Sequence, residues 1–177
     1  MELQIYELAD IAAILGLEKA RVKNWTIGRP FSVRPSIRPS FGKGTRNLFS
    51  KSDVYCFALV KRLNEIGTPV SAIQQMLKDY GAELAEDSRW WGGGAWLVIE
   101  RLGSSDRIGI QVTYKDAAHG HAYMMLRPED EVACFYAVNL KLLADAISTR
   151  IDVFSDQHEK LTPKKSKKKK HPDAKQR

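Results

Sequence analysis

The sequence contains few cysteines and no long apolar run. Only two of its 177 residues are cysteine, Cys56 and Cys134, and each lies in an apolar pattern typical of a helix. We therefore expect buried free thiols in a reducing compartment. No apolar run approaches the roughly 20 residues that a membrane span needs, and no apolar signal segment opens the chain. These absences predict a cytoplasmic protein without a membrane partner.

Motifs of catalysis and of metal or phosphate binding are also absent. The sequence contains no CxxC, HExxH, phosphate loop or nucleophile elbow. His119 and His121 lie two residues apart, so on a strand they would face the same side, but no further metal-ligand spacing accompanies them. The glycines at 92–94 have neither a preceding strand nor a following Lys-Ser/Thr. We expect no enzymatic activity, no metal site and no cofactor.

Acidic residues are scarce in one part of the chain and abundant in another. Residues 18–62 contain 11 Lys/Arg against two Asp/Glu, whereas residues 81–162 contain eight against 13. Residues 163–177 carry eight Lys/Arg and one acid, and they are expected to be disordered because they cannot build a core. A basic zone beside an acidic half predicts a polyanion-binding module joined to a part with a different task.

A short helix, a glycine and a second, cationic helix are predicted between residues 6 and 27. Apolar residues at positions 8, 11, 12 and 15 follow helical spacing, and Gly16 then interrupts them. The second helix has Val22 and Trp25 on one side and cations elsewhere on its surface. This pattern is typical of a helix-turn-helix, whose second helix enters the major groove of DNA.

A basic segment rich in proline and glycine follows at residues 28–49. Three prolines and three glycines exclude a long helix there, and the repeat RPS-I-RPS places two arginines four residues apart on a stiff backbone. One interpretation is an exposed basic loop. Because the segment directly follows a helix-turn-helix, we favour a β-hairpin wing that lies along phosphates or enters a minor groove.

Two further helices are predicted after the basic segment. Ser50 and Asp53 form a pattern close to a capping box at the start of the first of them. Thr68 and Pro69 begin the second, with threonine as the N-cap and proline in the first turn. The short connection near Gly67 makes these helices antiparallel neighbours.

This order of elements resembles the MerR-type winged helix-turn-helix. That family closes its wing with a glycine and an arginine, followed by an aromatic residue, Ser-x-x-Asp and an apolar helix. The matching positions here are Gly44, Arg46, Phe49, Ser50 and Asp53. The resemblance covers residues 6–77. Three features depart from it: Glu18 begins the second helix, the wing is longer and richer in proline, and the glycines at 92–94 interrupt any long dimerising helix.

The resemblance implies that the second helix and the wing bind double-stranded DNA. From it we expect Arg21, Lys23, Asn24 and Arg46 to face DNA. Their charge and their place on the second helix and in the wing add five more residues to this set: Lys19, Arg29, Arg34, Arg38 and Lys43. Trp25 is expected either to pack in the core or to touch the DNA backbone, and core packing is the favoured interpretation.

The pattern changes from Ala95 onward. Alternating or apolar segments at 96–102, 107–114 and 121–128 predict three antiparallel strands. A proline and three acids at 128–131 favour a helix start, and apolar positions then predict a helix to about residue 148. Five aromatic residues either fill a core and a self-association face or line a small-molecule pocket. They are Trp90, Trp91, Trp96, Tyr114 and Tyr123.

The predicted fold class is α+β, with a winged helix-turn-helix at 1–85, a small domain of three strands and one helix at 86–155, and a disordered basic tail at 156–177. The predicted function is sequence-specific regulation of transcription on the nucleoid, by a homodimer formed through the C-terminal domain. An architectural or phage-type DNA-binding protein (an excisionase or a packaging subunit) and a protein-interaction adaptor are the alternatives. The sequence indicates no particular small-molecule effector.

Overall fold

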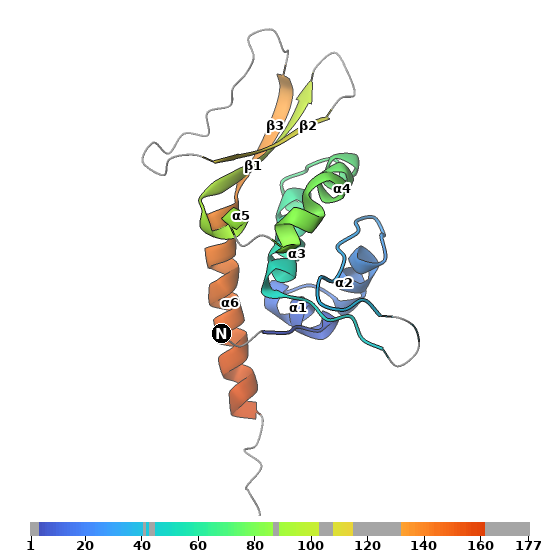
Figure 1. Ribbon diagram of the computed structural model, residues 1–177, viewed down its shortest axis with the longest axis vertical. Coiled ribbons are helices and arrows are strands. Elements are labelled where there is room, and N and C mark those ends of the chain that lie inside the picture. The colour runs from blue at the N-terminus through green and yellow to red at the C-terminus, as the bar shows by residue number, and fades with distance from the viewer. Residues whose placement is uncertain are drawn as a thin grey trace, which may run out of the picture.

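The computed structural model describes residues 4–40, 42, 45–86, 89–102, 108–114 and 132–161. Helices dominate its N-terminal part, and a small sheet and a long helix form the C-terminal part (Figure 1). The elements are α1 (Leu8–Leu15), α2 (Lys19–Thr26), α3 (Lys51–Glu65), α4 (Val70–Glu86), α5 (Arg89–Gly92), β1 (Ala95–Leu102), β2 (Ile108–Tyr114), β3 (Val132–Asn139) and α6 (Leu140–Leu161). The α+β fold class predicted from the sequence is confirmed.

The turn between α1 and α2 has the geometry that the sequence predicts. Gly16 adopts φ 61° and ψ 43°, in the left-handed region that glycine enters at little cost. Its backbone N–H donates to the carbonyls of the last turn of α1, and the N–H of Leu17 donates to Ala12 O over 2.9 Å. Leu17 packs partly buried against the core beneath this turn. The turn between the two helices is therefore formed by Gly16 in the left-handed conformation and stabilised by the packing of Leu17.

Helix α3 is the centre of the fold. Nine of its 15 residues are buried, so it is surrounded by other elements on most sides. Ser50 and Asp53 form the predicted capping box at its start, with each side chain accepting from the other residue's backbone N–H. Helix α4 packs against α3 and begins at Val70, since the carbonyl of Pro69 accepts the first helical bonds. The Thr68 hydroxyl is buried without a partner and does not make the capping bond predicted for it.

The C-terminal sheet has the order β2-β1-β3, with both pairs antiparallel. β1 and β2 lie where two strands are predicted. The predicted helix at 128–148 is wrong in its first part, because residues 132–139 form β3 and pair with the free edge of β1. This run is rich in valine and aromatic residues, which suit a strand. The strand predicted at 121–128 lies outside the described residues.

Helix α6 begins at Leu140, where the Asn139 side chain accepts from the N–H of Leu142 over 2.9 Å. It runs to Leu161, beyond residue 156, where we predicted that a disordered tail begins. Residues 162–177, the rest of the predicted tail, lie outside the described residues. Of the described helices, none combines the length and the apolar composition that crossing a membrane requires.

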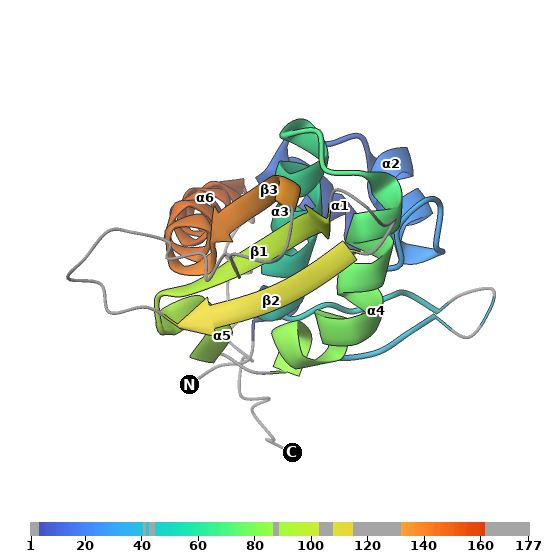
Figure 2. The same ribbon diagram turned by 90° about the horizontal axis from the view of Figure 1, so that it is seen from above.

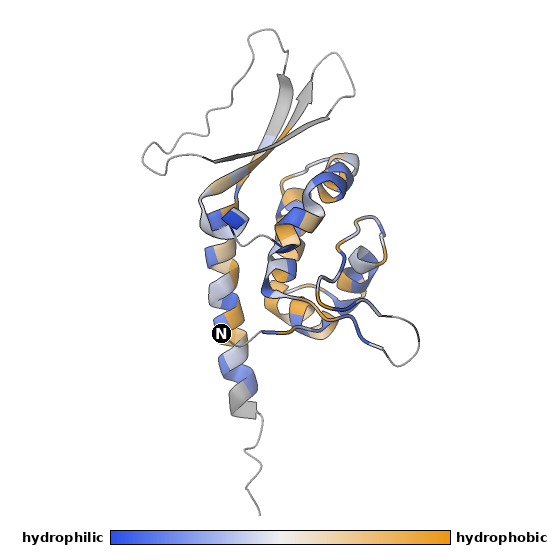
Figure 3. Cartoon of the chain, in the orientation of Figure 1, coloured by the Kyte–Doolittle hydropathy of each residue, from blue (hydrophilic) through white to orange (hydrophobic). Residues whose placement is uncertain are grey.

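Helix α6 joins the two halves of the chain. It packs along α1, α3 and α5, and the sheet lies across the same end of the molecule as α5 (Figures 1 and 2). Apolar residues occupy the side of α6 that faces these helices, with Ile147 and Ile151 buried (Figure 3). The Tyr55 and Ser148 hydroxyls are 2.7 Å apart across this contact. One continuous core therefore spans the predicted boundary at residue 85.

Candidate nucleic-acid interface

Helix α2 has one buried side and one cationic side. Val22 and Trp25 are buried, and the Trp25 ring makes an edge contact with Phe31 at a centroid distance of 5.5 Å. Trp25 is therefore a core residue, as favoured from the sequence. The polar residues of α2 that are predicted to contact DNA are all exposed: Lys19, Arg21, Lys23 and Asn24.

Arg21 is oriented by the residue that anchors the helix. Its guanidinium carbon lies 5.7 Å from the centroid of the Trp25 ring, within the range of a cation–π contact. Glu18 stands at the N-cap without a side-chain capping bond, and α2 itself contains no acidic residue. The exposed side of α2 thus presents three cations and one amide.

The wing is a short hairpin on a buried base. Phe31, Val33 and Phe49 are buried beneath it, and the strand that returns to α3 pairs with Tyr6 through two 3.0 Å backbone hydrogen bonds at Phe49. Further out, Arg38 and Leu48 exchange backbone hydrogen bonds of 3.1 and 2.8 Å. The predicted cations of the wing that the structure describes are all exposed: Arg29, Arg34, Arg38 and Arg46. Lys43 lies outside the described residues.

Arg46 is tied to the start of α1. One of its guanidinium nitrogens donates to both carboxylate oxygens of Glu7, at 2.6 and 2.9 Å. This hydrogen bond and the charge of Glu7 raise the pKa of Arg46 further above its ordinary value. Glu7 is also the N-cap of α1. The pair therefore links the wing to the helix-turn-helix, and no spacing in the sequence indicates it.

Asp53 does more than cap α3. Its side chain is fully buried, and Oδ2 accepts from the backbone N–H of Ser36 at 3.0 Å and from the Ser36 hydroxyl at 2.7 Å, besides the capping bond from Ser50 N at 2.8 Å. The sequence predicts the cap alone. Nothing in the sequence pairs Ser36 with Asp53 across 17 positions, because the contact depends on how the wing folds back.

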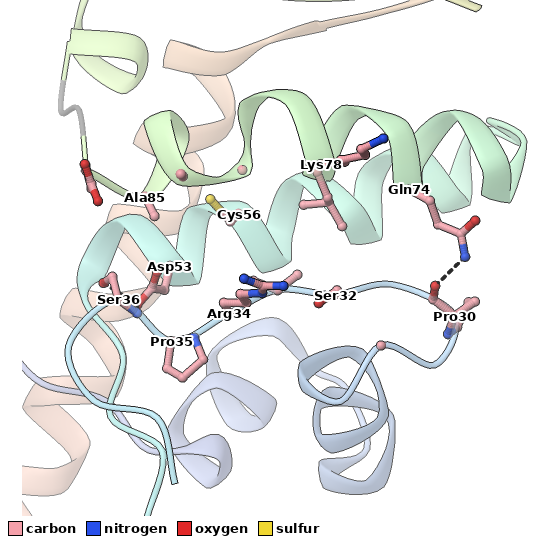
Figure 4. Close-up of a pocket in the computed structure, with 16 residues that line it drawn as sticks. Pro30, Ser32, Arg34, Pro35, Ser36, Asp53, Cys56, Gln74, Lys78 and Ala85 are labelled. Atoms are coloured by element: carbon pink, nitrogen blue, oxygen red, sulfur yellow. Dashed lines mark hydrogen bonds between the residues drawn. The ribbon is translucent and has the colours of Figure 1, made fainter. Parts of the chain in front are cut away.

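A cavity of about 620 Å³ separates the outgoing part of the wing from α4 (Figure 4). At one end Gln74 Nε2 donates to Pro30 O over 2.7 Å, and Ser36 and Asp53 lie toward the other. Arg34 and Lys78 are among its lining residues. The two arginines of the RPS repeat are therefore not equivalent: Arg34 lines this cavity, whereas Arg38 belongs to the hairpin.

Cys56 and Trp91 are both buried in the core. Cys56 is a buried free thiol of α3, and burial raises its pKa. Cys134 lies in β3 and not in a helix. Trp91 is buried, with its ring 5.2 Å from that of Tyr55 and its Nε1 donating to Leu84 O over 2.8 Å. Trp91 is thus a core residue and does not line the cavity beside the wing.

One cation of the basic zone at residues 18–62, Lys61 in α3, bonds to the end of another helix. Lys61 Nζ donates to the Leu15 carbonyl over 2.9 Å and lies 3.6 Å from the Glu65 carboxylate. It therefore caps the C-terminal end of α1. Within the described ranges no group of three or more His, Cys, Asp and Glu is arranged to hold a metal ion, and His119 and His121 fall outside those ranges.

The exposed cations predicted to meet DNA belong to two neighbouring elements. Figure 1 shows α2 and the wing together on the side away from α6. We call the exposed cations of these two adjoining elements the basic surface: Lys19, Arg21, Lys23, Arg29, Arg34, Arg38 and Arg46. A surface of this kind suits the evenly spaced phosphates of a nucleic acid.

Comparison with known families agrees with this arrangement. The sequence model described as "MerR HTH family regulatory protein" matches residues 6–80, from the lead-in of α1 into α4. No curated protein matches the chain. The match contains the helix-turn-helix, the wing and the α3–α4 pair, and it supports a double-stranded DNA-binding regulator of transcription. Residues 6–80 of this chain belong to the MerR helix-turn-helix family.

Proposed function

We propose that the chain binds a specific duplex sequence with α2 in the major groove and the wing arginines on the flanking backbone or minor groove. The observation that carries the proposal is the exposed side of α2. Arg21, Lys23 and Asn24 project from a helix that Val22 and Trp25 fix in the core. Arginine and asparagine are suited to reading guanine and adenine edges through paired hydrogen bonds.

Arg21 is the residue best prepared to read a base. Its contact with the Trp25 ring restricts the guanidinium before DNA arrives, so less conformational entropy is lost on binding. Lys19, near the start of α2, is placed for a phosphate. In this proposal Arg29, Arg38, Lys43 and Arg46 supply sequence-independent contacts from the wing, and Arg34 does so from the edge of the cavity.

The proposal includes a homodimer formed through the C-terminal half. A recognition helix of eight residues contacts few base pairs, and paired half-sites supply the missing specificity. Leu142 and Val153 are 65% and 53% exposed on α6, 11 positions apart, which is three helical turns. We expect a two-fold contact along this side of α6. Light scattering on the full chain measures its mass in solution. Leu142→Lys should shift this mass toward that of a monomer, and the neighbouring Leu143, which is half-buried, is not changed.

Selection from a random pool of duplex DNA tests the function. The full chain is used, because α6 completes the core of the DNA-binding part. The expected result is an enriched motif with two inverted half-sites, which reports base reading and dimer symmetry together. Tight binding without enrichment supports the architectural protein instead. Absence of duplex binding at low salt supports the protein-interaction adaptor.

A further inference from the structure

We infer that Asp53 is a positioning residue for DNA binding: through Ser36 it fixes a bend in the wing and thereby sets where Arg38 meets the backbone. The inference rests on the proposed contact between the wing and DNA. It concerns a buried carboxylate that cannot itself touch DNA, since Asp53 has no exposed surface. Its effect on binding must therefore pass through the chain that it holds.

The bend lies between two wing arginines with different surroundings. The backbone bends at Ser36 and Ile37, after Arg34 at the cavity and before Arg38 in the hairpin. Asp53 Oδ2 holds the bend by two bonds, from Ser36 N at 3.0 Å and from Ser36 Oγ at 2.7 Å. The Ser36 and Ser50 hydroxyls are 3.0 Å apart beside it. Figure 4 shows Ser36 and Asp53 side by side at this end of the cavity.

The anchor is strong because its acceptor is a fixed carboxylate. Asp53 belongs to the first turn of α3 and is held there by the capping box with Ser50. Hydrogen bonds to a charged acceptor are roughly twice as strong as those between neutral groups. Movement of Ser36 would leave a buried carboxylate with fewer donors, which is costly. The bend is thus tied to the most buried helix of the fold.

The hairpin beyond the bend has little support of its own. In the part of the wing that the structure describes, its two sides are connected by the Arg38–Leu48 pair, by the 2.6 Å bond from Ser40 N to Asn47 Oδ1 and, at the loop, by bonds from Thr45 N and Oγ1 to Gly42 O. An isolated two-stranded hairpin is at best marginally stable in water. The direction of the hairpin therefore depends on attachments outside it. Tyr6 and the Glu7–Arg46 pair hold the returning side, and Asp53 holds the outgoing side through Ser36.

The Ser36 hydroxyl allows the anchor to be weakened without unfolding α3. Ser36→Ala removes the 2.7 Å bond to Asp53 and the 3.0 Å contact with the Ser50 hydroxyl, but it leaves the backbone bond to Asp53 and both bonds of the capping box. We expect an unchanged far-ultraviolet spectrum and duplex affinity about fivefold lower for all sequences alike, the size of one lost hydrogen bond. Ser36→Thr keeps the donor and should restore affinity. Ser32→Ala, an exposed serine earlier in the same segment, serves as the matched control.

A double-mutant cycle with Arg38→Ala separates positioning from general loss of stability. If the anchor positions Arg38, Arg38→Ala should reduce duplex affinity less in the Ser36→Ala background than in the native chain. Faster motion of the wing amides in nuclear relaxation measurements on free Ser36→Ala should accompany the loss. If Arg38→Ala weakens binding equally in both backgrounds, the positioning role is overturned while the proposed wing contact stands. If Arg38→Ala has no effect in the native chain, the wing contact itself fails, and the positioning role fails with it.

Discussion

The two parts of the basic surface are held in place by different physics. Helix α2 is pinned by apolar burial, through Val22 and Trp25. The wing keeps an apolar base, but its position is set by polar contacts: Asp53 to Ser36, Glu7 to Arg46 and Gln74 to Pro30. Apolar burial in a packed core fixes a helix rigidly. Of these contacts, the exposed Glu7–Arg46 pair can exchange with water or with phosphate, whereas the bond from Ser36 ends on a buried carboxylate.

The difference matches the two tasks that we propose. Reading base edges requires side chains held within a fraction of an ångström, and a helix fixed in the core provides that. Following a phosphate backbone whose groove width varies with sequence requires adjustment. The position of the wing can adjust, because few of the described hydrogen bonds connect the two sides of its hairpin. In addition, a phosphate can replace the Glu7 carboxylate that Arg46 binds. Predictions can therefore be ranked by which kind of attachment they remove.

The largest effect is expected from Trp25→Ala. Removing a buried tryptophan costs about 3–5 kcal/mol of folding free energy, and it also removes the ring that orients Arg21. Urea unfolding should show a lower midpoint, and duplex binding should lose its sequence preference. Ile27→Ala is the control, since Ile27 is 56% exposed at the end of the same helix. A small effect of Trp25→Ala on both readouts would contradict the claim that burial holds α2.

The helix-turn-helix could be predicted closely because its signals are local. Gly16, the Ser50–Asp53 cap and the spacing of apolar residues act within one or two helical turns, and the structure confirms each of them. The family resemblance carried these signals further, to the order of elements. The exposure of the α2 cations followed from the same periodicity, since Val22 and Trp25 identify the opposite, buried side.

The C-terminal half and the wing contacts depended on partners far away in the sequence. Residues 132–139 were assigned to a helix because apolar residues there suit either period, and only the free edge of β1 decides for a strand. The predicted helix ends at about residue 148, short of Leu161, because the buried side of α6 is defined by its contacts with α1 and α3 and not by a local pattern. Ser36 with Asp53 and Arg46 with Glu7 are 17 and 39 positions apart, beyond any local pattern.

An intermediate effect, confined to binding, is expected from Arg21→Ala with Lys23→Ala. Both side chains are exposed, so unfolding should change little. A paired contact to a base contributes about 1–3 kcal/mol of discrimination, and the selected motif should lose its strongest positions. Lys141→Ala with Arg150→Ala removes the same charge from the exposed side of α6 and controls for net charge. If both pairs of substitutions weaken binding alike and leave the motif intact, α2 acts only as a cationic surface.

The smallest effect is expected from Arg46→Ala, and its character matters more than its size. Arg46 is exposed and donates to Glu7, so DNA binding would exchange a carboxylate for a phosphate with little net gain. We expect a modest loss of affinity, equal for all sequences, and a salt slope reduced by about one. Glu7→Gln should act in the opposite direction, because it weakens the competitor and leaves Arg46 charged. Titrations at several salt concentrations, on the selected site and on an unrelated duplex, measure both. A change in sequence preference on Arg46→Ala would show that the wing also reads bases, and the division between a reading helix and a holding wing would then fail.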